Sequence, residues 1–365
     1  MKQYIVFCTT LLLLSSCSGT SESGSDMPVM DLAANVDKDS YGNPEDIFEI
    51  KTVIRPEFTD SSMLSTMMNL RGVIGNKIFI EENETLMTFD KTTGKCLSSF
   101  NKKGNGPGEY RMIHYQWPTS DGKGWVVENI VGGNRILAYD LYGNCTMERT
   151  DTLCGAIYPY GTGWAGVSEF AEGSNMKIYF YDSAWQLTDT LTTPFVYETL
   201  ASEEGPVWMS RELTYSDNRL FIENNDTLYS IDRGGLHPEV AFTLGSYASP
   251  RFTSFEEMYA NAKNYIRYDS FVIQDYVIVA YNCKGAITIQ IYDRSGKLLL
   301  SRTSRGEESP GFPVVLDGQT YYALPAQYSS GDCIYCGIDE AQLGAGTGTD
   351  DINPLLLELR LKPRP

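Results

Sequence analysis

Histidine is nearly absent from this sequence, which holds only His114 and His237 among its 365 residues. A Ser-His-Asp triad would need one of these two, and no Gly-x-Ser-x-Gly segment, the turn that presents a nucleophilic serine, is present. Zinc sites usually draw on several His or Cys ligands, and the Asp-x-Asp-x-Asp-Gly calcium loop is also missing. The sequence therefore lacks the usual motifs of a serine hydrolase or a calcium-binding loop.

Positive charge and long apolar runs are scarce as well. The chain has 29 Lys and Arg against 47 Asp and Glu, which gives a formal net charge of −18. An acidic surface of this size repels nucleic-acid phosphates and anionic lipid headgroups, so we expect no nucleic-acid partner. A neutral or cationic partner, or a divalent cation, is compatible with the charge. After the first residues, no apolar run approaches the roughly 20 residues that span a bilayer.

The N-terminal residues have the layout of an export signal. Lys2 precedes an apolar run from Ile5 to Leu14, which is too short to span a bilayer. The run ends in Leu14-Ser15-Ser16-Cys17, which resembles the lipobox of bacterial lipoproteins, in which the cysteine is lipidated and becomes the mature N-terminus. We therefore predict a signal peptide over residues 1–16 and lipidation of Cys17. The alternative is an ordinary signal peptide, with Cys17 incidental.

The residues after Cys17 are expected to tether the protein to a membrane. Residues 18–26 are polar, and such a composition cannot bury enough apolar surface to fold. We predict lipidated Cys17 and a flexible tether over residues 17–44, followed by a single domain over residues 45–365. The lipid would be the only membrane attachment, at the outer membrane or elsewhere in the cell envelope, facing the periplasm or the outside.

A recurring unit runs through the predicted domain. Each copy has an alternating strand, an aspartate, a turn residue that is usually glycine, and a further strand; the aspartates are Asp90, Asp140, Asp182, Asp232 and Asp293. The carboxylate accepts hydrogen bonds from the turn backbone, and glycine supplies the positive φ that a tight hairpin needs. Spacings of 50, 42, 50 and 61 residues, with several strands per repeat, are typical of a β-propeller.

The two ends of the domain predict how the ring closes. Residues 48–54 and 355–361 both have the pattern of strands. Propellers often combine the first and last strands in one blade, so we expect these two segments to share a blade. Helix is scarce: Ser254 to about Asn264 begins with a capping box, and residues 339–343 are a second short candidate.

Three segments resemble a known family. They are Gly104-Asn105-Gly106-Pro107-Gly108-Glu109-Tyr110, then Asn225-Asp226-Thr227-Leu228-Tyr229, and finally Asn353-Pro354-Leu355 with Leu359-Arg360-Leu361-Lys362. In this order they resemble the six-bladed β-propeller lipoproteins of Bacteroidetes-type bacteria. The resemblance implies six blades and an envelope lipoprotein without an established activity. Because the repeat shows five clear units, the sixth blade rests partly on this resemblance. The predicted fold is all-β, a six-bladed β-propeller closed by its terminal strands.

The most unusual segment supplies the candidate ligand-binding residues. Glu109, Tyr110 and Arg111 follow the Gly-Pro-Gly bend, and His114 lies just past it. One interpretation places them at a mouth of the propeller axis, where propellers usually bind ligands. The alternative is a glycine-bent connection between blades, in which Glu109 accepts hydrogen bonds from backbone N–H groups. His237, which precedes Pro238, is expected to be exposed in a loop.

Six cysteines remain after the predicted signal and lipidation site, namely Cys96, Cys145, Cys154, Cys283, Cys333 and Cys336. Outside the cytoplasm they can form disulfides in 15 connectivities, or several of them are buried free thiols. Cys333 and Cys336 have redox spacing. Their surroundings are β rather than the helix start that thioredoxin-like chemistry needs, which favours a structural thiol pair or a local disulfide.

The leading functional prediction is a non-enzymatic binding or scaffold protein at the cell envelope, which presents a propeller face to a glycan, a peptide or a protein partner. The alternative is a calcium-dependent propeller hydrolase or lactonase, with Asp, Glu and Asn around the axis holding the ion. That alternative requires several carboxylates to converge at one mouth of the ring. No cofactor is predicted, and calcium is the one ion that this alternative would need.

Overall fold

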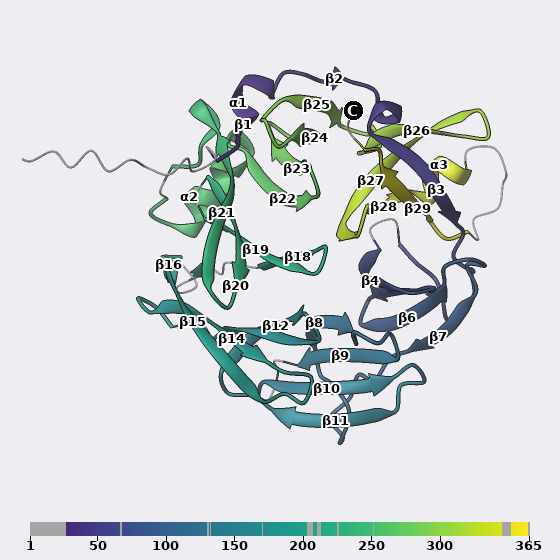
Figure 1. The fold of residues 1–365 in the computed structure, drawn as a ribbon, viewed down its shortest axis with the longest axis vertical. Helices are drawn as coiled ribbons and strands as arrows, with labels where there is room; N and C mark the ends of the chain where they lie inside the picture. The colour runs from purple at the N-terminus through teal and green to yellow at the C-terminus, as the bar shows by residue number, and fades with distance from the viewer. Residues whose placement is uncertain are drawn as a thin grey trace, which may run out of the picture.

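The computed structural model describes residues 27–65, 68–129, 131, 133–169, 171–202, 207–209, 213–224, 226–250, 252–344 and 352–363. They form six sheets of four or five strands that stand side by side around a central axis, as Figure 1 shows, and one two-stranded sheet. The predicted six-bladed β-propeller is therefore confirmed. Among these residues, no helix is long and apolar enough to cross a membrane.

Each blade is built on an antiparallel sheet, and the blades are numbered from 1 to 6 in the order of the chain. Blade 1 consists of β4 (Asn69–Ile74), β5 (Lys77–Glu82), β6 (Thr85–Asp90) and β7 (Cys96–Phe100). Blade 2 consists of β8 (Ile113–Pro118), β9 (Gly124–Asn129), β10 (Arg135–Asp140) and β11 (Cys145–Thr150). Blade 3 consists of β12 (Cys154–Tyr160), β13 (Gly163–Ser168), β14 (Asn175–Tyr181) and β15 (Leu187–Val196).

The second half of the ring continues the same order. Blade 4 consists of β18 (Leu213–Ser216), β19 (Arg219–Asn224), β20 (Thr227–Asp232) and β21 (Gly235–Thr243). Blade 5 consists of β22 (Arg267–Ile273), β23 (Tyr276–Cys283), β24 (Ala286–Asp293) and β25 (Leu298–Arg305). Blade 6 consists of β26 (Phe312–Leu316), β27 (Gln319–Ser330), β28 (Cys333–Ile338), β29 (Leu355–Leu361) and β3 (Phe48–Ile54).

Alternating strand positions fill the spaces between neighbouring blades with apolar side chains. Phe79 of β5 meets Trp125 of β9 edge to face between blades 1 and 2, with ring centroids 5.2 Å apart. The same alternation explains the cysteines of β28. Cys336 packs with side chains of blade 5, whereas Cys333 packs with side chains of blade 1, so the two thiols lie on opposite faces of one sheet.

The turn aspartates behave as the repeat predicts. Asp90 Oδ1 accepts hydrogen bonds from the backbone N–H groups of Thr92 and Thr93 at 3.0 and 2.8 Å. The hydrogen bond from the Thr93 N–H, the largest cause, lowers the pKa of the Asp90 carboxyl. In blade 3 Trp185 occupies the left-handed turn position with a φ of +61°, where Gly143 of blade 2 has +79°. The side chain of an aspartate and one positive φ therefore suffice to build this turn.

The ring closes through the two terminal strands. β3 pairs antiparallel with β29, from Phe48 opposite Leu361 to Ile54 opposite Leu356. The predicted pairing of residues 48–54 with residues 355–361 in one blade is therefore confirmed.

The segment before β3 is folded as well. β1 (Val29–Asp31) adds to β21 in parallel, α1 (Leu32–Asn35) follows it, and β2 (Ser40–Tyr41) pairs with β25. Figure 1 shows this segment along the outer rim of the ring, and η1 (Pro44–Asp46) leads it into β3. The predicted flexible tether is therefore wrong for residues 27–44, because they complete the outer edges of blades 4 and 5. Residues 1–26, including Cys17, lie outside the described part of the chain.

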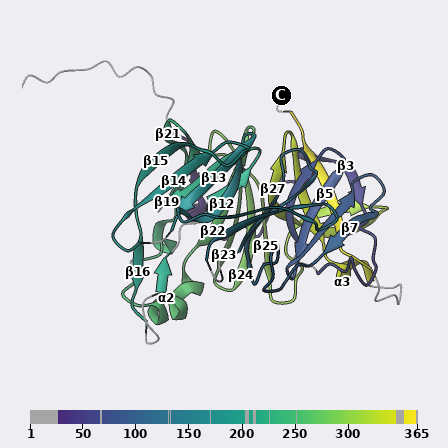
Figure 2. The same cartoon turned by 90° about the horizontal axis from the view of Figure 1, so that it is seen from below.

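The two ends of the ring differ. Figure 2 shows α2 (Phe255–Asn261) and β16 (Glu198–Leu200) at one end, and the C-terminus at the other. We call the first the α2 end. In a blade, the innermost strand begins at the α2 end and the second strand ends there, while the turn that carries the aspartate lies at the opposite end.

The two predicted helices are present. Ser254 caps α2, as its capping box predicts, and α3 (Glu340–Gly344) corresponds to the second predicted helix. β16 pairs with β17 (Val207–Met209), and a bridge from Ala201 to Ser254 joins this hairpin to α2.

Candidate binding site at one end of the axis

Two of the four predicted ligand-binding residues hold the connection between blades 1 and 2. Tyr110 is fully buried, and its hydroxyl donates to the Glu84 carbonyl at 2.7 Å. Burial raises the pKa of Tyr110 to about 12. Glu109 Oε2 accepts a hydrogen bond from the backbone N–H of Gly106 at 2.7 Å. Tyr110 therefore belongs to the core, and Glu109 makes the backbone contact that the glycine-bent connection requires.

The other two predicted ligand-binding residues, Arg111 and His114, have different surroundings from each other. Arg111 donates from Nε to Asn105 Oδ1 at 2.6 Å and stays at the surface of the connection. His114 lies on β8, where the register with β9 shifts between Ile113 and Tyr115. Its side chain is 40% exposed, and its Nδ1 atom lies 3.7 Å from Glu128 Oε2. Of the four residues, His114 is therefore the one that lies beside a buried acidic group at the α2 end.

Glu128 belongs to a set of three structurally equivalent glutamates. Glu81, Glu128 and Glu223 occur near the ends of β5, β9 and β19. Their cross-strand partners are Leu86, Ile136 and Leu228, each four residues before the turn aspartate of its blade. These glutamates are not among the residues predicted from the sequence. Their signal is a glutamate after three apolar residues, as in Ile78-Phe79-Ile80-Glu81, Trp125-Val126-Val127-Glu128 and Leu220-Phe221-Ile222-Glu223.

Two of the three glutamates receive a hydrogen bond from the innermost strand of the next blade. Gln116 of β8 donates to Glu81 Oε2 at 2.9 Å. Ser270 of β22 donates to Glu223 Oε1 at 2.5 Å. Gln116 and Ser270 stand at the same register position, opposite Val127 and Val279 of their own blades.

Glu128 lacks such a donor. The corresponding position of β12, opposite Gly166, is Ile157, whose side chain cannot donate a hydrogen bond. Glu128 is 1% exposed, and its Oε2 atom has no hydrogen-bond partner among the described residues. Burial raises the pKa of the Glu128 carboxyl, as do the Asp151 and Glu169 carboxylates, while His114 opposes the shift. The structure thus retains a buried, unsatisfied carboxyl group, which is costly unless something binds it.

Glu223 lies beside a polar cleft at the same end. Burial is the main cause that raises the pKa of Glu223 to about 8, so the group is largely protonated at neutral pH. The neighbouring cleft has a volume of about 450 Å³. Its walls are polar for the most part, and the lining residues are Ala262, Lys263, Arg267, Tyr268, Asp269 and Asn282. This part of the ring offers hydrogen-bond donors, acceptors and one aromatic ring to a polar ligand.

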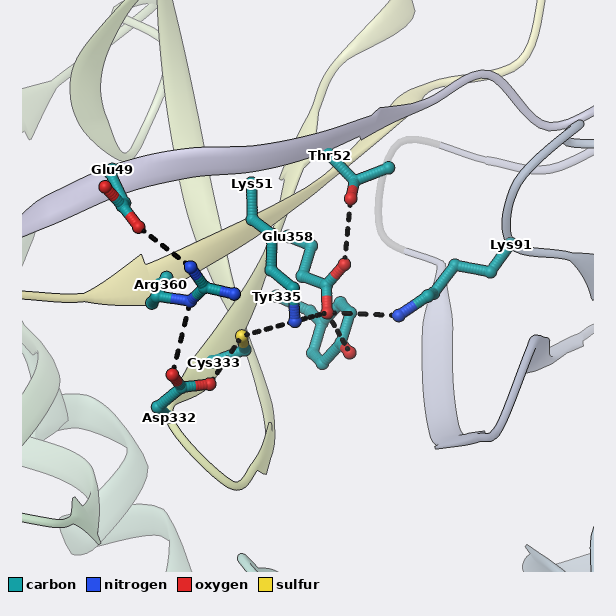
Figure 3. A network of polar contacts seen from close by, with 9 residues as sticks. All are labelled: Glu49, Lys51, Thr52, Lys91, Asp332, Cys333, Tyr335, Glu358 and Arg360. Carbon is teal, nitrogen blue, oxygen red and sulfur yellow. Dashed lines mark hydrogen bonds and ion pairs between the residues drawn. The ribbon is translucent and has the colours of Figure 1, made fainter.

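A fourth buried glutamate, Glu358, has hydrogen-bond donors to both oxygens of its carboxyl group (Figure 3). Glu358 of β29 is 2% exposed and accepts hydrogen bonds from Lys51, Lys91 and Thr52 at 3.0, 3.1 and 3.0 Å. Burial opposes ionisation, yet these three donors hold the pKa of Glu358 at about 2. Because Lys51 and Thr52 lie on β3 and Lys91 follows β6, this network links the closing strands of blade 6 to blade 1. Its role is structural.

Metal ligands do not converge within the described residues. No group of three or more His, Cys, Asp or Glu side chains there is placed to hold an ion. The ligand set that the calcium-dependent hydrolase requires is therefore not found in the described part of the ring.

The six cysteines that follow Cys17 all lie within the described residues and are free thiols. Cys333 and Cys336 face different blades, which rules out the local disulfide. Burial raises the pKa of Cys333 to about 11 and also raises the pKa of Cys336, so neither is a reactive thiolate at neutral pH. The two residues are structural, as their β surroundings predict. His237, expected in a loop, lies on β21 and pairs with Asp232 at 3.0 Å.

Comparison with known families identifies the chain. The model of the domain of unknown function DUF4934 matches residues 27–342. The chain belongs to this family. A search of curated proteins finds no relative of it.

Two solved structures with the same fold come from Bacteroides species. A putative exported protein from Bacteroides fragilis NCTC 9343 is similar, with a TM-score of 0.60 and 15% identity over 88% of this chain and 97% of that one. A member of the DUF4221 family from Bacteroides vulgatus ATCC 8482 has a TM-score of 0.57 and 11% identity, over 87% of this chain and 98% of that one. At such identities the likeness is one of fold.

Proposed function

We propose that this DUF4934 protein is a cell-envelope lipoprotein whose propeller is a non-enzymatic binding module for a glycan, a peptide or a protein partner. Lipid, palmitate included, would attach to Cys17 and hold the ring at the membrane. The export-type N-terminus supports this location, and so does the fold shared with the putative exported protein from Bacteroides fragilis. The acidic surface and the scarcity of histidine support binding over hydrolysis.

The ligand site is the α2 end of the axis. One observation carries this choice: Glu128 Oε2 is buried there without a hydrogen-bond partner. At the opposite end, the turn carboxylates are already used by their own turns, as the pKa of Asp140, lowered mainly by the hydrogen bond from the Asn144 side chain, illustrates. A polar ligand at the α2 end would also meet the cleft beside Arg267 and Asp269.

Glycan and peptide arrays test the proposed site. The chain from residue 19 on, which contains every described residue, would be probed beside an Arg267→Ala/Asp269→Ala variant. A matched variant at the opposite end, Asp121→Ala/Lys123→Ala, also removes one anion and one cation from exposed positions. We expect ligands of the unmodified chain and of the matched variant to be lost from the first variant. Equal binding by all three proteins would contradict the placement, and an empty array would contradict the function.

The anchor has its own test. Expression of the full chain with labelled palmitate should label the protein and place it in the membrane fraction. Cys17→Ser should abolish the label and release the protein. A labelled Cys17→Ser variant, or unlabelled membrane-bound wild type, would contradict lipidation at this residue.

Calcium removal tests the hydrolase alternative directly. We expect the same melting temperature in EDTA and in millimolar calcium. An ion at 100 times its dissociation constant would add about 2.7 kcal/mol to the free energy of unfolding, which would raise the melting temperature visibly. Such a rise would reopen the alternative.

A further inference from the structure

We infer that the corner between blades 2 and 3 at the α2 end, formed by His114, Glu128 and Glu169, binds a cationic amine or guanidinium group of the ligand. The inference rests on the proposed function and deepens it. It starts from the comparison of equivalent positions: blades 2 and 5 supply a donor to the glutamate of the preceding blade, and blade 3 supplies Ile157 instead. The missing donor at Glu128 is the group that a ligand would provide.

The charges around Glu128 select the chemistry of that donor. Asp151 and Glu169 are the carboxylates that add to burial in raising the pKa of Glu128. Arg149 lies 3.5 Å from Asp151 Oδ2 and offsets its charge. Glu169 accepts a hydrogen bond from the neutral Asn134 amide, which brings no positive charge to offset the carboxylate. A phosphate or carboxylate would be repelled here, whereas an N–H donor with a positive charge would gain a charge-assisted hydrogen bond.

The wall of this corner also suits a cation. His114 contacts the Tyr115 ring with centroids 4.3 Å apart, and Tyr115 contacts Tyr158 with centroids 5.2 Å apart. Aromatic faces attract ammonium and guanidinium groups. His114 is the extra residue of the register shift in β8, and it is partly exposed in front of the buried carboxyl. A ligand cation would therefore approach past the imidazole and replace it as the partner of Glu128.

Two peptides that differ in one charge provide the probe. N-acetyl-Gly-Lys-Gly-amide, in which the lysine ammonium is the single cationic group, and its acetyl-lysine counterpart would be titrated by calorimetry into the chain from residue 19 on. We expect the lysine peptide to bind with a Kd of about 1 mM, as one charge-assisted hydrogen bond and a contact with the aromatic wall together allow. The acetylated peptide should bind at least about tenfold more weakly, because acetylation removes the charge. Equal affinities, or no binding of the lysine peptide, would overturn the inference.

Variants of two equivalent glutamates locate the contact. Glu128→Gln should weaken binding of the lysine peptide about tenfold or more. Glu81→Gln is the matched control, because Glu81 already has Gln116 and Asn69 as donors, and it should leave the affinity unchanged. Equal losses in both variants, or none in Glu128→Gln, would overturn the assignment. An array ligand that binds wild type, is lost from Arg267→Ala/Asp269→Ala and survives Glu128→Gln would overturn this inference alone and leave the proposed function standing.

Discussion

Glu358 and Glu128 are both almost completely shielded from solvent, and their pKa values shift in opposite directions. Glu358 is 2% exposed and Glu128 is 1% exposed. Two lysines and a threonine hold the pKa of Glu358 at about 2 despite its burial, whereas burial raises the pKa of Glu128, which His114 alone opposes from 3.7 Å. The comparison teaches that burial alone does not define the role of a carboxyl group. The complete set of partners makes Glu358 a structural group, and the incomplete set at Glu128 is the basis of the proposed ligand contact.

Removal of the Glu358 carboxylate, which has a full set of partners, should have the largest effect on the free energy of unfolding. Glu358→Gln leaves Lys51 and Lys91 without their carboxylate at the closure of the ring, and we expect a loss of about 3 kcal/mol in the free energy of unfolding. Chemical denaturation at neutral pH measures it. Glu49→Gln is the control, because Glu49 and Arg360 form an exposed pair, and it should cost less than about 1 kcal/mol. Equal small losses would show that the network does not close the ring.

Acid should weaken the same network. The pKa of Glu358 falls from 4.5 to about 2 on folding, so its contribution is complete above pH 4.5 and is lost as the pH falls toward 2. Over that window the difference in stability between wild type and Glu358→Gln should shrink by up to about 3 kcal/mol. Denaturation curves of both proteins between pH 5.5 and pH 3, at steps of about 0.5, measure the trend. A constant difference would contradict it.

Glu223 should respond to pH with the opposite sign. Its pKa is raised from 4.5 to about 8, so the folded state retains a proton that the unfolded state releases. Stability should therefore fall as the pH rises from 4.5 to 8, by at most about 1.4 kcal/mol per pH unit. Glu223→Gln should abolish this slope, and urea denaturation from pH 5 to pH 8 measures it. Identical slopes in both proteins would mean that Glu223 ionises normally.

The sequence predicts the regular parts of this molecule because their chemistry is local. An aspartate with a glycine three residues later, as at Asp140 and Gly143, forms its turn within a few residues. The two strands that close the ring can be predicted from their own alternation of apolar and polar residues. Residues 27–44 were misjudged because their strands are short and gain partners only on the rim. The role of Glu128 depends on Ile157 in another blade, and that relation exists only once the register between blades is known.

A hydrogen-bond donor introduced at position 157 should give Glu128 the partner that Glu81 and Glu223 already have. The free energy of unfolding should change little. Ile157→Gln would supply the amide that Gln116 supplies to Glu81, at a buried position of similar volume. We expect a net change within about 1 kcal/mol, since a lost apolar contact is offset by a new hydrogen bond. The lysine peptide should then bind more weakly in calorimetry. Unchanged binding of the lysine peptide would mean that the carboxyl group of Glu128 does not contact it.

The most direct test of the central claim is the same substitution at both glutamates. Glu358→Gln and Glu128→Gln would be unfolded in urea at neutral pH under identical conditions. We expect a loss of about 3 kcal/mol for Glu358→Gln, and for Glu128→Gln a change within about 0.5 kcal/mol or a gain, because Glu128→Gln removes a buried carboxyl group whose Oε2 atom has no hydrogen-bond donor. Equal losses in the two variants would contradict it, since Glu128 would then be as fully satisfied in the folded protein as Glu358.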